Sequence, residues 1–377
     1  MNAPSAAPQG PPQPKTDPRS IAWQAAALAA VVLAGAWLVH NATVNLAARN
    51  IASGFGFLKD TAGFAISEGL MPYEAGDSYA RAFAAGVANT LRASLPAIVL
   101  ATALGFTLGI AQVSRHALVR TLSRGFVDLV RNVPLLVQVL LWYFALTELL
   151  PNGEEALHVS DVAYLSKGGF AFAVPDLTAS QAMVPVLLTA MAAWLAWNAR
   201  RRWRGIAIPV AIVAIAALWI FWPDEWKRPE VTGFGIAGGA TLTPEWIALV
   251  VALTQYSGAY CAEIVRAGLQ AVAKGQWEAT HALGLTRAQA LRRVIVPQSL
   301  RVIVPPYTSL LMNTIKNSSL AVAIGYPDIV SVATTSLNQN GQAIECIAII
   351  AAVYLMLNLF TALVMSVVNR RVQLKER

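Results

Sequence analysis

The sequence contains few charged residues for its length. Charged side chains make up 13% of the 377 residues, whereas hydrophobic ones make up 56%. An ordinary soluble domain has about 25% charged residues, and the mean hydropathy of +0.54 is well on the apolar side. This composition argues against a single soluble domain and is typical of a membrane protein.

Cysteine and histidine are scarce, and a nucleotide-binding motif is absent from the sequence. The two cysteines, Cys261 and Cys346, lack the number and spacing of a disulfide framework or a metal site. The histidines are scattered along the chain, at His40, His116, His158 and His281. No G-x-x-x-x-G-K-[ST] sequence, catalytic triad or paired-carboxylate motif is present. We therefore expect no metal, no cofactor and no catalysis, so any ATP that drives this protein must be hydrolysed on another chain.

Eight apolar runs are long enough to cross a bilayer as helices. Such a crossing needs about 20 residues, whereas barrel strands alternate over about 10 residues. The runs cover residues 21–39, 86–113, 132–150, 177–199, 205–223, 244–265, 302–326 and 344–369. Because only helices or closed barrels satisfy the backbone in lipid, the sequence predicts an all-α, polytopic membrane helix bundle with about eight transmembrane helices.

Basic residues gather in alternate connections between these runs. If the N-terminus is cytoplasmic, the inner segments hold 20 of the 28 Lys and Arg residues but only four of the 20 acids. Every connection then obeys the positive-inside rule, which predicts a multi-pass protein with both termini in the cytoplasm. The net charge of +8 is explained by this topology, so we expect no nucleic-acid partner.

The apolar runs also set the organisation of the chain. Residues 1–20, rich in proline and small polar residues, are predicted to form a disordered cytoplasmic tail. Residues 21–85 hold the first transmembrane helix, rather than a cleaved signal peptide, and a periplasmic segment. Residues 86–369 form the main transmembrane domain, and residues 370–377 form a second cytoplasmic tail. The outer connections are expected to be loops, near residues 40–85, 151–176, 224–243 and 327–343.

The longest inner connection, residues 267–301, is too polar to span a membrane. A helical pattern breaks at Gly284-Leu285-Thr286 and then resumes. Thr286 is a suitable N-cap for the second helix, and Gly284 permits a left-handed turn. The connection is predicted to form two short helices joined by a tight turn. On this pattern alone, an ordinary amphipathic cytoplasmic loop would be the favoured interpretation.

This connection resembles the cytoplasmic EAA loop of ABC importer permeases. The family pattern is E-A-A, three residues, G, nine residues and I-x-L-P, and it is matched by Glu278-Ala279-Thr280, Gly284 and Val294-Ile295-Val296-Pro297. Thr280, Val294 and Val296 are mild departures from it. The resemblance implies that Glu278, Ala279, Gly284 and Pro297 couple the chain to a separate ATPase subunit. It also implies the type I ABC importer permease fold.

Two further segments resemble permeases for polar amino acids. Residues 131–138, RNVPLLVQ, match R-[GN]-x-P-L-L-x-Q, and residues 313–320, NTIKNSSL, match N-x-x-K-x-[ST]-S-L. The N-terminal third is similar to a permease subunit of the general L-amino-acid importers of α-proteobacteria. Compared with the minimal five-helix permease of this family, the chain has an additional first helix, and residues 177–223 resemble an inserted helical hairpin. The resemblance implies a location in the bacterial inner membrane, a cargo of L-amino acids, and three partners: an ATPase, a second homologous permease and a periplasmic amino-acid-binding protein.

Several polar side chains occur within the apolar runs, where they are costly unless they serve transport or hydrogen-bond between helices. The candidates for a substrate path are Asn89, Gln138, Asn313, Lys316, Ser318 and Ser319. Lys316 is expected about midway along its helix, on one face with Asn313. Hydrogen bonding between helices is the alternative role for each of them. Glu263 and Arg266 have the spacing of a helical ion pair, and residues 105–109, GFTLG, permit close helix packing.

Two other functions fit part of the sequence. An ion-coupled secondary amino-acid transporter needs no ATPase, but that class often shows internal repeats, and none is clear here. A membrane scaffold for other proteins would leave the polar cluster around Lys316 without a purpose. Neither explains the 267–301 connection, so an importer permease without its own catalytic site is the leading hypothesis.

Overall fold

The structure is a computed structural model of the chain. It describes residues 18–48, 54–176, 185–192, 194, 204–221, 225–233 and 235–373. The predicted disordered tail lies outside the described residues up to residue 17, and so does most of the predicted span 177–199. The last four residues of the predicted C-terminal tail are likewise outside them.

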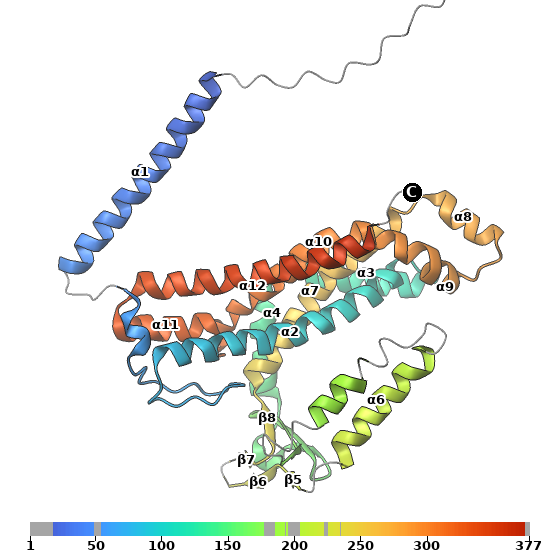
Figure 1. Cartoon of the computed structure of the whole chain (residues 1–377). Helices are drawn as coiled ribbons and strands as arrows, with labels where there is room; N and C mark the ends of the chain where they lie inside the picture. Colours follow the sequence, from blue (N-terminus) through green and yellow to red (C-terminus); the bar gives the residue numbers. More distant parts are fainter. Residues whose placement is uncertain are drawn as a thin grey trace, which may run out of the picture.

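Long helices make up the body of the molecule. Helices α2 (Tyr79–Gln112), α7 (Pro244–Gln270), α10 (Val296–Asn317) and α12 (Ala343–Val372) pack into one bundle (Figure 1). Helix α1 (Pro18–Ala48) stands apart from them, and none of its apolar stretch is buried. The prediction of a helical membrane bundle is therefore confirmed.

Two candidate spans of the structure are bent pairs of helices. Helices α3 (Ala117–Asn132) and α4 (Leu135–Leu149) meet at an angle of 100°. Pro134 lies at this corner, where it lacks a backbone N–H and disfavours helical geometry at Val133. The sequence analysis assigned the arginines of this stretch to an inner connection between spans. The structure shows that most of this connection is the strongly amphipathic helix α3.

The second bent pair follows α10. A 3₁₀ turn, η4 (Ser318–Ile324), continues α10 and is followed at an angle of 52° by α11 (Ile329–Asn340). Asp328 caps α11 by accepting from the backbone N–H of Ser331 at 2.9 Å. The expected outer loop at 327–343 is therefore mostly helix. Within the described residues, four helices can span a membrane, or six if each bent pair is one span. The total of eight stays a prediction.

Close contact between the parallel helices α2 and α7 forms the centre of the bundle. A Cβ on Gly105 would lie 2.3 Å from the Cβ of Cys261, and one on Gly109 would lie 2.7 Å from that of Val265. Glycine at these two positions therefore lets the helices approach closely, as residues 105–109 suggested. Ala93, Ala97, Leu249 and other buried apolar side chains continue the same contact outward.

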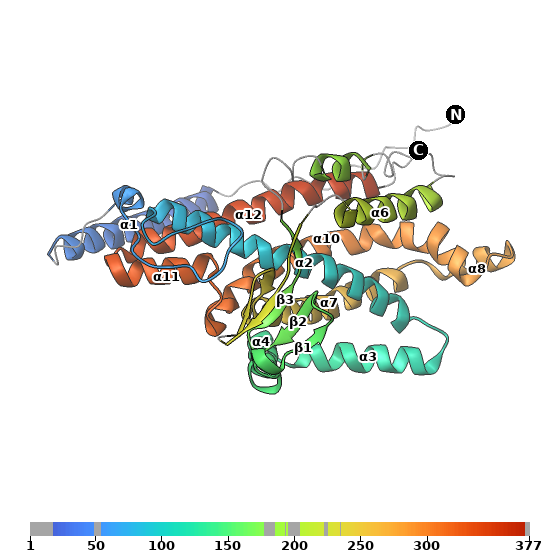
Figure 2. The same cartoon turned by 90° about the horizontal axis from the view of Figure 1, so that it is seen from below.

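A small β module replaces two expected loops. Strands β1 (Leu157–Val159), β2 (Ala163–Ser166), β3 (Gly169–Phe172) and β8 (Ala240–Leu242) form an antiparallel sheet in that order. Strand β8 leads directly into α7, so the sheet lies beside α4 and α7 (Figure 2). Two short ladders accompany it: β4 (Val174–Pro175) with β5 (Trp226–Lys227), and β6 (Glu230–Thr232) with β7 (Gly235–Ala237). Helix α6 (Arg204–Phe221), which covers most of the predicted run 205–223, lies between β4 and β5 in the chain.

Residues 54–78, which precede α2, pack against the bundle. This segment begins with a 3₁₀ turn, η1 (Phe55–Lys59), whose Phe57 packs edge-on against Tyr79 and Phe83 of α2. The backbone N–H of Gly54 donates to the Glu345 carboxylate at 2.6 Å, at the start of α12. This segment therefore joins the N-terminal ends of α2 and α12.

Candidate functional site

The predicted coupling element forms two short helices at one end of the bundle. Helix α8 (Lys274–Ala282) ends in a left-handed turn at Gly284, where φ is +67°. The N–H of Gly284 donates to the carbonyl of His281 at 3.0 Å, and that of Leu285 donates to the carbonyl of Thr280 at 3.1 Å. This is the bonding of a Schellman motif, in which glycine avoids the Cβ penalty. The predicted turn is confirmed.

The second short helix begins as the sequence predicted. Helix α9 (Arg287–Ala290) is capped by Thr286, whose hydroxyl accepts from the N–H of Gln289, while the Gln289 side chain accepts from the N–H of Thr286. This reciprocal capping box fixes the direction of the chain after the turn. A π-helical stretch, η3 (Leu291–Ile295), then leads into α10.

One face of α8 is exposed, and we call the side that carries Glu278 its outer face. Glu278 and Ala279 are exposed, and Glu278 makes no hydrogen bond or ion pair with any described residue. Leu283, which the sequence interpretation did not single out, is 77% exposed at the tip of the turn. Pro297 is also exposed, at the start of α10. The face thus presents a carboxylate and a large apolar side chain.

Contacts on the inner side tie this element to the transmembrane helices. The Arg287 guanidinium lies 5.7 Å from the Trp277 ring of α8 and donates to the carbonyl of Val113, just after α2. Ile295 is fully buried against Val265 and Leu269 of α7. These contacts connect α8 and α9 to the C-terminal ends of α2 and α7.

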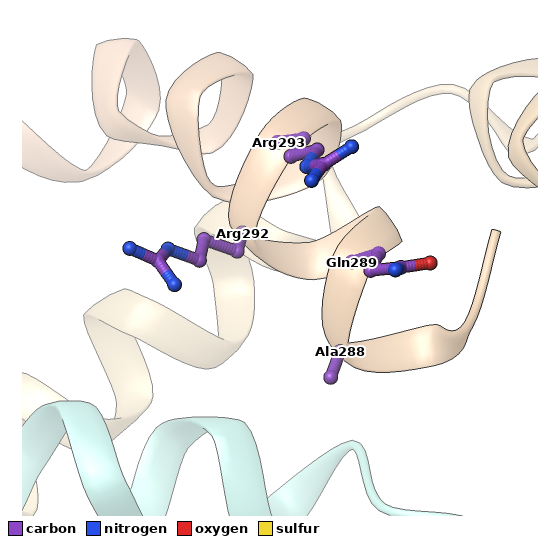
Figure 3. Close-up of a pocket in the computed structure, with 4 residues that line it drawn as sticks. All are labelled: Ala288, Gln289, Arg292 and Arg293. Atoms are coloured by element: carbon purple, nitrogen blue, oxygen red, sulfur yellow. The ribbon is translucent and has the colours of Figure 1, made fainter. Parts of the chain in front are cut away.

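A basic pocket of about 830 Å³ opens beside α9 (Figure 3). Its lining consists of Ala288, Gln289, Arg292 and Arg293. Both arginines are exposed, and their side chains extend in different directions. These are two of the basic residues that gave the 267–301 connection its charge. They offer an acidic partner two separate anchoring points.

The residues predicted to line a substrate path fall into different environments. Asn313 and Lys316 are exposed on one face of α10, and Ser309 one turn before them is exposed as well. Lys316 lies in the last turn of α10 rather than midway along a regular helix, because the helix tightens into η4 at Ser318. Ser318 is buried and donates to the carbonyl of Ile315 at 2.7 Å, and Ser319 is half-buried.

Gln138 is part of the α3–α4 corner. Its side-chain amide donates to the carbonyls of Val130 and Val133, both at 2.9 Å. These carbonyls belong to the end of α3, which the bend at Pro134 leaves without helical partners. The geometry of Gln138 is therefore that of a residue that stabilises the corner. Nearby, Glu263 forms the predicted ion pair with Arg266 at 2.7 Å and a longer one with Arg131 at 3.7 Å.

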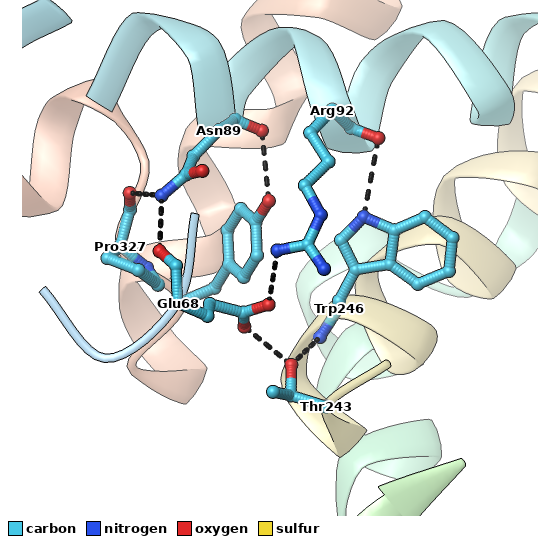
Figure 4. Close-up of polar contacts among 7 residues, drawn as sticks. Glu68, Asn89, Arg92, Thr243, Trp246 and Pro327 are labelled. Atoms are coloured by element: carbon cyan, nitrogen blue, oxygen red, sulfur yellow. Dashed lines mark hydrogen bonds and ion pairs between the residues drawn. The ribbon is translucent and has the colours of Figure 1, made fainter. Parts of the chain in front are cut away.

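Asn89 belongs to a polar network at the end of the bundle where α2 and α7 begin (Figure 4). Its side-chain amide donates to the carbonyls of Glu68 and Pro327, at 2.9 and 3.0 Å. The Tyr326 hydroxyl donates to the backbone carbonyl of Asn89 at 3.0 Å. Asn89 thus connects the segment before α2 with the turn before α11.

The other half of this network is an ion pair that the sequence interpretation missed. The Glu68 carboxylate lies 2.6 Å from the Arg92 guanidinium and also accepts from the Thr243 hydroxyl at 2.5 Å. The Trp246 indole donates to the carbonyl of Arg92 at 3.3 Å. Burial raises the pKa of Glu68, and the bonds from Thr243 and Arg92 act against that rise. The network joins four segments that are far apart in the sequence.

Known proteins resemble this chain over most of its length. Residues 203–374 match the family model described as "Binding-protein-dependent transport system inner membrane component". YhdX of Escherichia coli strain K12, named as an amino-acid ABC transporter permease protein, is 43% identical over 96% of both chains. The general L-amino acid transport system permease protein AapQ of Rhizobium johnstonii is 39% identical, over 95% of this chain and 93% of its own.

A solved structure is also similar to this one. It is described as a crystal structure of an amino acid ABC transporter with histidines, and its TM-score is 0.48 at 22% identity. The alignment covers 78% of this chain and 95% of that one.

Proposed function

Because the chain belongs to the family of binding-protein-dependent transport system inner membrane components, we propose that it carries L-amino acids inward through an ATP-driven importer. The names of two relatives, amino-acid permeases that span nearly the whole chain, support this cargo. The coupling element carries the proposal. One side of this element contacts α2 and α7, and the outer face of α8 is exposed. This arrangement suits an element that binds an ATPase and transmits its movement to the bundle.

Family membership implies an ATPase partner and a binding protein, and we propose how they meet this chain. The outer face of α8, with Glu278 and Leu283, inserts into a groove of the ATPase. The turn at Gly284 holds Leu283 at the tip of that face. Arg292 and Arg293 add charge-assisted contacts at the side. The binding protein delivers its cargo at the opposite end of the bundle.

A second, homologous permease is proposed to cover the polar face of α10. Asn313 and Lys316 are exposed in the isolated chain, and an exposed lysine within an apolar bundle is unfavourable against lipid. A partner helix with polar groups would enclose a path between the two chains. On this path, Lys316 offers a charge-assisted hydrogen bond to the carboxylate of an amino acid.

Reconstitution tests the proposed function directly. The chain is placed in vesicles with its ATPase, the second permease and the binding protein, and uptake of a labelled L-amino acid mixture is measured with and without ATP. We expect uptake only when ATP and the ATPase are both present. Uptake driven by an ion gradient in the absence of the ATPase would instead support a secondary transporter.

A further inference from the structure

A second basic pocket, of about 370 Å³, lies between α8 and the inner ends of α2, α3 and α7. Its polar lining includes Gln112 and Ser114 after α2, Arg120 and Arg124 on α3, and Lys274 on α8. Trp277 of α8 lies on its apolar side, and none of its lining residues is acidic. Three positive charges therefore converge on one concave site that the coupling role of α8 does not use.

The charged groups of this pocket keep free donors. Among the described residues, neither Arg124 nor Lys274 has a hydrogen-bond or ion-pair partner. Arg120 donates one N–H to the carbonyl of Ser114 at 3.0 Å, which holds its guanidinium in place and leaves its other donors available. Arginines and lysines on a protein surface usually have water or an acid beside them, so an acid-free cluster of three in a pocket favours an anion.

A buried amide supplies a separate indication of a ligand. Gln112 is only 1% exposed, and its side-chain Nε2 lies close to the Glu263 carboxylate without a hydrogen bond of normal geometry. An unpaired buried donor costs about 1–3 kcal/mol, so native structures rarely retain one without a partner. Gln112 lines the pocket, where an anionic oxygen would satisfy it.

The position of the pocket identifies the source of the anion. Leu118 and Leu122 of α3 are 71% and 64% exposed, on the side of that helix opposite Arg120 and Arg124. An amphipathic helix of this kind lies at the boundary of the hydrocarbon. Basic pockets between helices on the cytoplasmic side are suited to lipid phosphate groups.

We propose that this pocket binds the phosphate of an anionic phospholipid from the cytoplasmic leaflet, held by Arg120, Arg124, Lys274 and Gln112. The bound phosphate contacts residues of α2, α3 and α8 and so stabilises the position of α8. The outer face of α8 stays available to the ATPase. The orientation used here rests on the proposed function, but lipid binding itself does not depend on transport.

The test is lipid retention by the assembled transporter in detergent. The complex is titrated with short-chain phosphatidylglycerol, short-chain phosphatidylcholine or inorganic phosphate, and bound ligand is counted by native mass spectrometry. We expect phosphatidylglycerol to be retained over phosphatidylcholine. The double variant Arg124→Gln/Lys274→Gln should weaken this binding by about tenfold or more, because each basic group near a membrane surface contributes about 1 kcal/mol.

Matched variants separate the site from general charge effects. Arg370→Gln/Arg371→Gln removes two basic residues from the last turn of α12, outside the pocket, and should leave lipid retention unchanged. Arg124→Lys/Lys274→Arg keeps both charges and should retain the lipid, which controls for misfolding of the glutamine variant.

Three results would overturn the proposal. Equal retention of both lipids would exclude a phosphate-specific site for anionic lipid. Binding of inorganic phosphate without phosphatidylglycerol would assign the pocket to a soluble anion. Phosphatidylglycerol binding that is present in the two permease chains alone and absent in the assembled transporter would assign the pocket to an acidic element of the ATPase subunit. Amino-acid uptake measured on the same preparations reports on the proposed function separately.

Discussion

At the scale of single residues, burial and hydrogen bonding divide the polar side chains of the bundle into two groups. Asn89 and Gln138 are buried and donate to backbone carbonyls, whereas Asn313 and Lys316 are exposed on α10. Sequence alone does not separate these groups, because one carbonyl partner of Asn89 lies 238 residues away. All four remain predicted path residues, and the geometry favours the pair on α10.

Replacement of Lys316 tests that preference. Lys316→Gln should lower amino-acid uptake by about tenfold or more, because a hydrogen bond to a charged group contributes about 1.5–3 kcal/mol. The amount of assembled transporter should not change, since Lys316 is exposed in the chain. Lys227→Gln, in the β module, serves as the control, because Lys227 forms an ion pair with Asp176, away from α10. Uptake at the normal rate in Lys316→Gln would remove this residue from the path.

The Glu68–Arg92 ion pair makes a second prediction at this scale. The side chains are 9% and 16% exposed, so removing one partner leaves the other charge buried. Arg92→Met should lower the free energy of unfolding by about 3–5 kcal/mol, measured as loss of thermal stability of the assembled complex. The exposed pair Arg81–Asp77 provides the comparison, and Arg81→Met should cost about 0–1 kcal/mol.

A double-mutant cycle separates the ion pair from the other contacts of Arg92. Glu68→Gln in the Arg92→Met background should restore part of the lost stability, because it removes the unpaired carboxylate. Additive losses in the double variant would show that the two charges do not interact, and that the Trp246 contact accounts for the effect of Arg92.

At the scale of elements, the close contact between α2 and α7 depends on Gly105 and Gly109, which have no side chain to separate the helices. Gly105→Ala places a methyl group 2.3 Å from the Cβ of Cys261 and 2.9 Å from the carbonyl oxygen of Gly258. Since backbone cannot yield easily, we expect a loss of about 1–3 kcal/mol of stability. Gly125→Ala, on α3, meets nothing within 4 Å and should be neutral or slightly stabilising. Thermal unfolding of both variants in detergent checks this, and equal midpoints would contradict the close packing.

The elements that the sequence did not predict share a physical cause. Residues 117–132 contain three arginines and no apolar run long enough to span a membrane, so charge counting assigned them to an inner connection. Their apolar residues nevertheless recur at helical spacing. The β strands have only two to four residues each, which is too short for a recognisable alternation. The turn at Gly284 and the Thr286 cap were predicted correctly, because both depend on local backbone chemistry.

At the scale of the whole molecule, the orientation in the membrane follows from charge and is open to labelling. Cysteine replaces exposed residues at the two ends: Asp161→Cys in the β module and Ala288→Cys in α9. The native Cys261 and Cys346 are buried and should react little. An impermeant thiol reagent added outside spheroplasts should label Asp161→Cys and not Ala288→Cys. The reverse pattern would invert the topology and move α8 away from a cytoplasmic ATPase.

The central claim is that α8 couples this chain to an ATPase, and Gly284 allows the most direct measurement. A β-branched residue is strongly disfavoured at its left-handed backbone, whereas asparagine tolerates it. We expect Gly284→Val to reduce amino-acid-stimulated ATP hydrolysis in reconstituted vesicles by about tenfold, because valine in this left-handed backbone conformation costs about 1–2 kcal/mol. Gly284→Asn should keep most of the stimulated hydrolysis. Both variants should fold and insert into the membrane normally, because nothing lies within 4 Å of a Cβ at this position. Full ATPase binding and full stimulated hydrolysis in Gly284→Val would contradict the coupling role of α8.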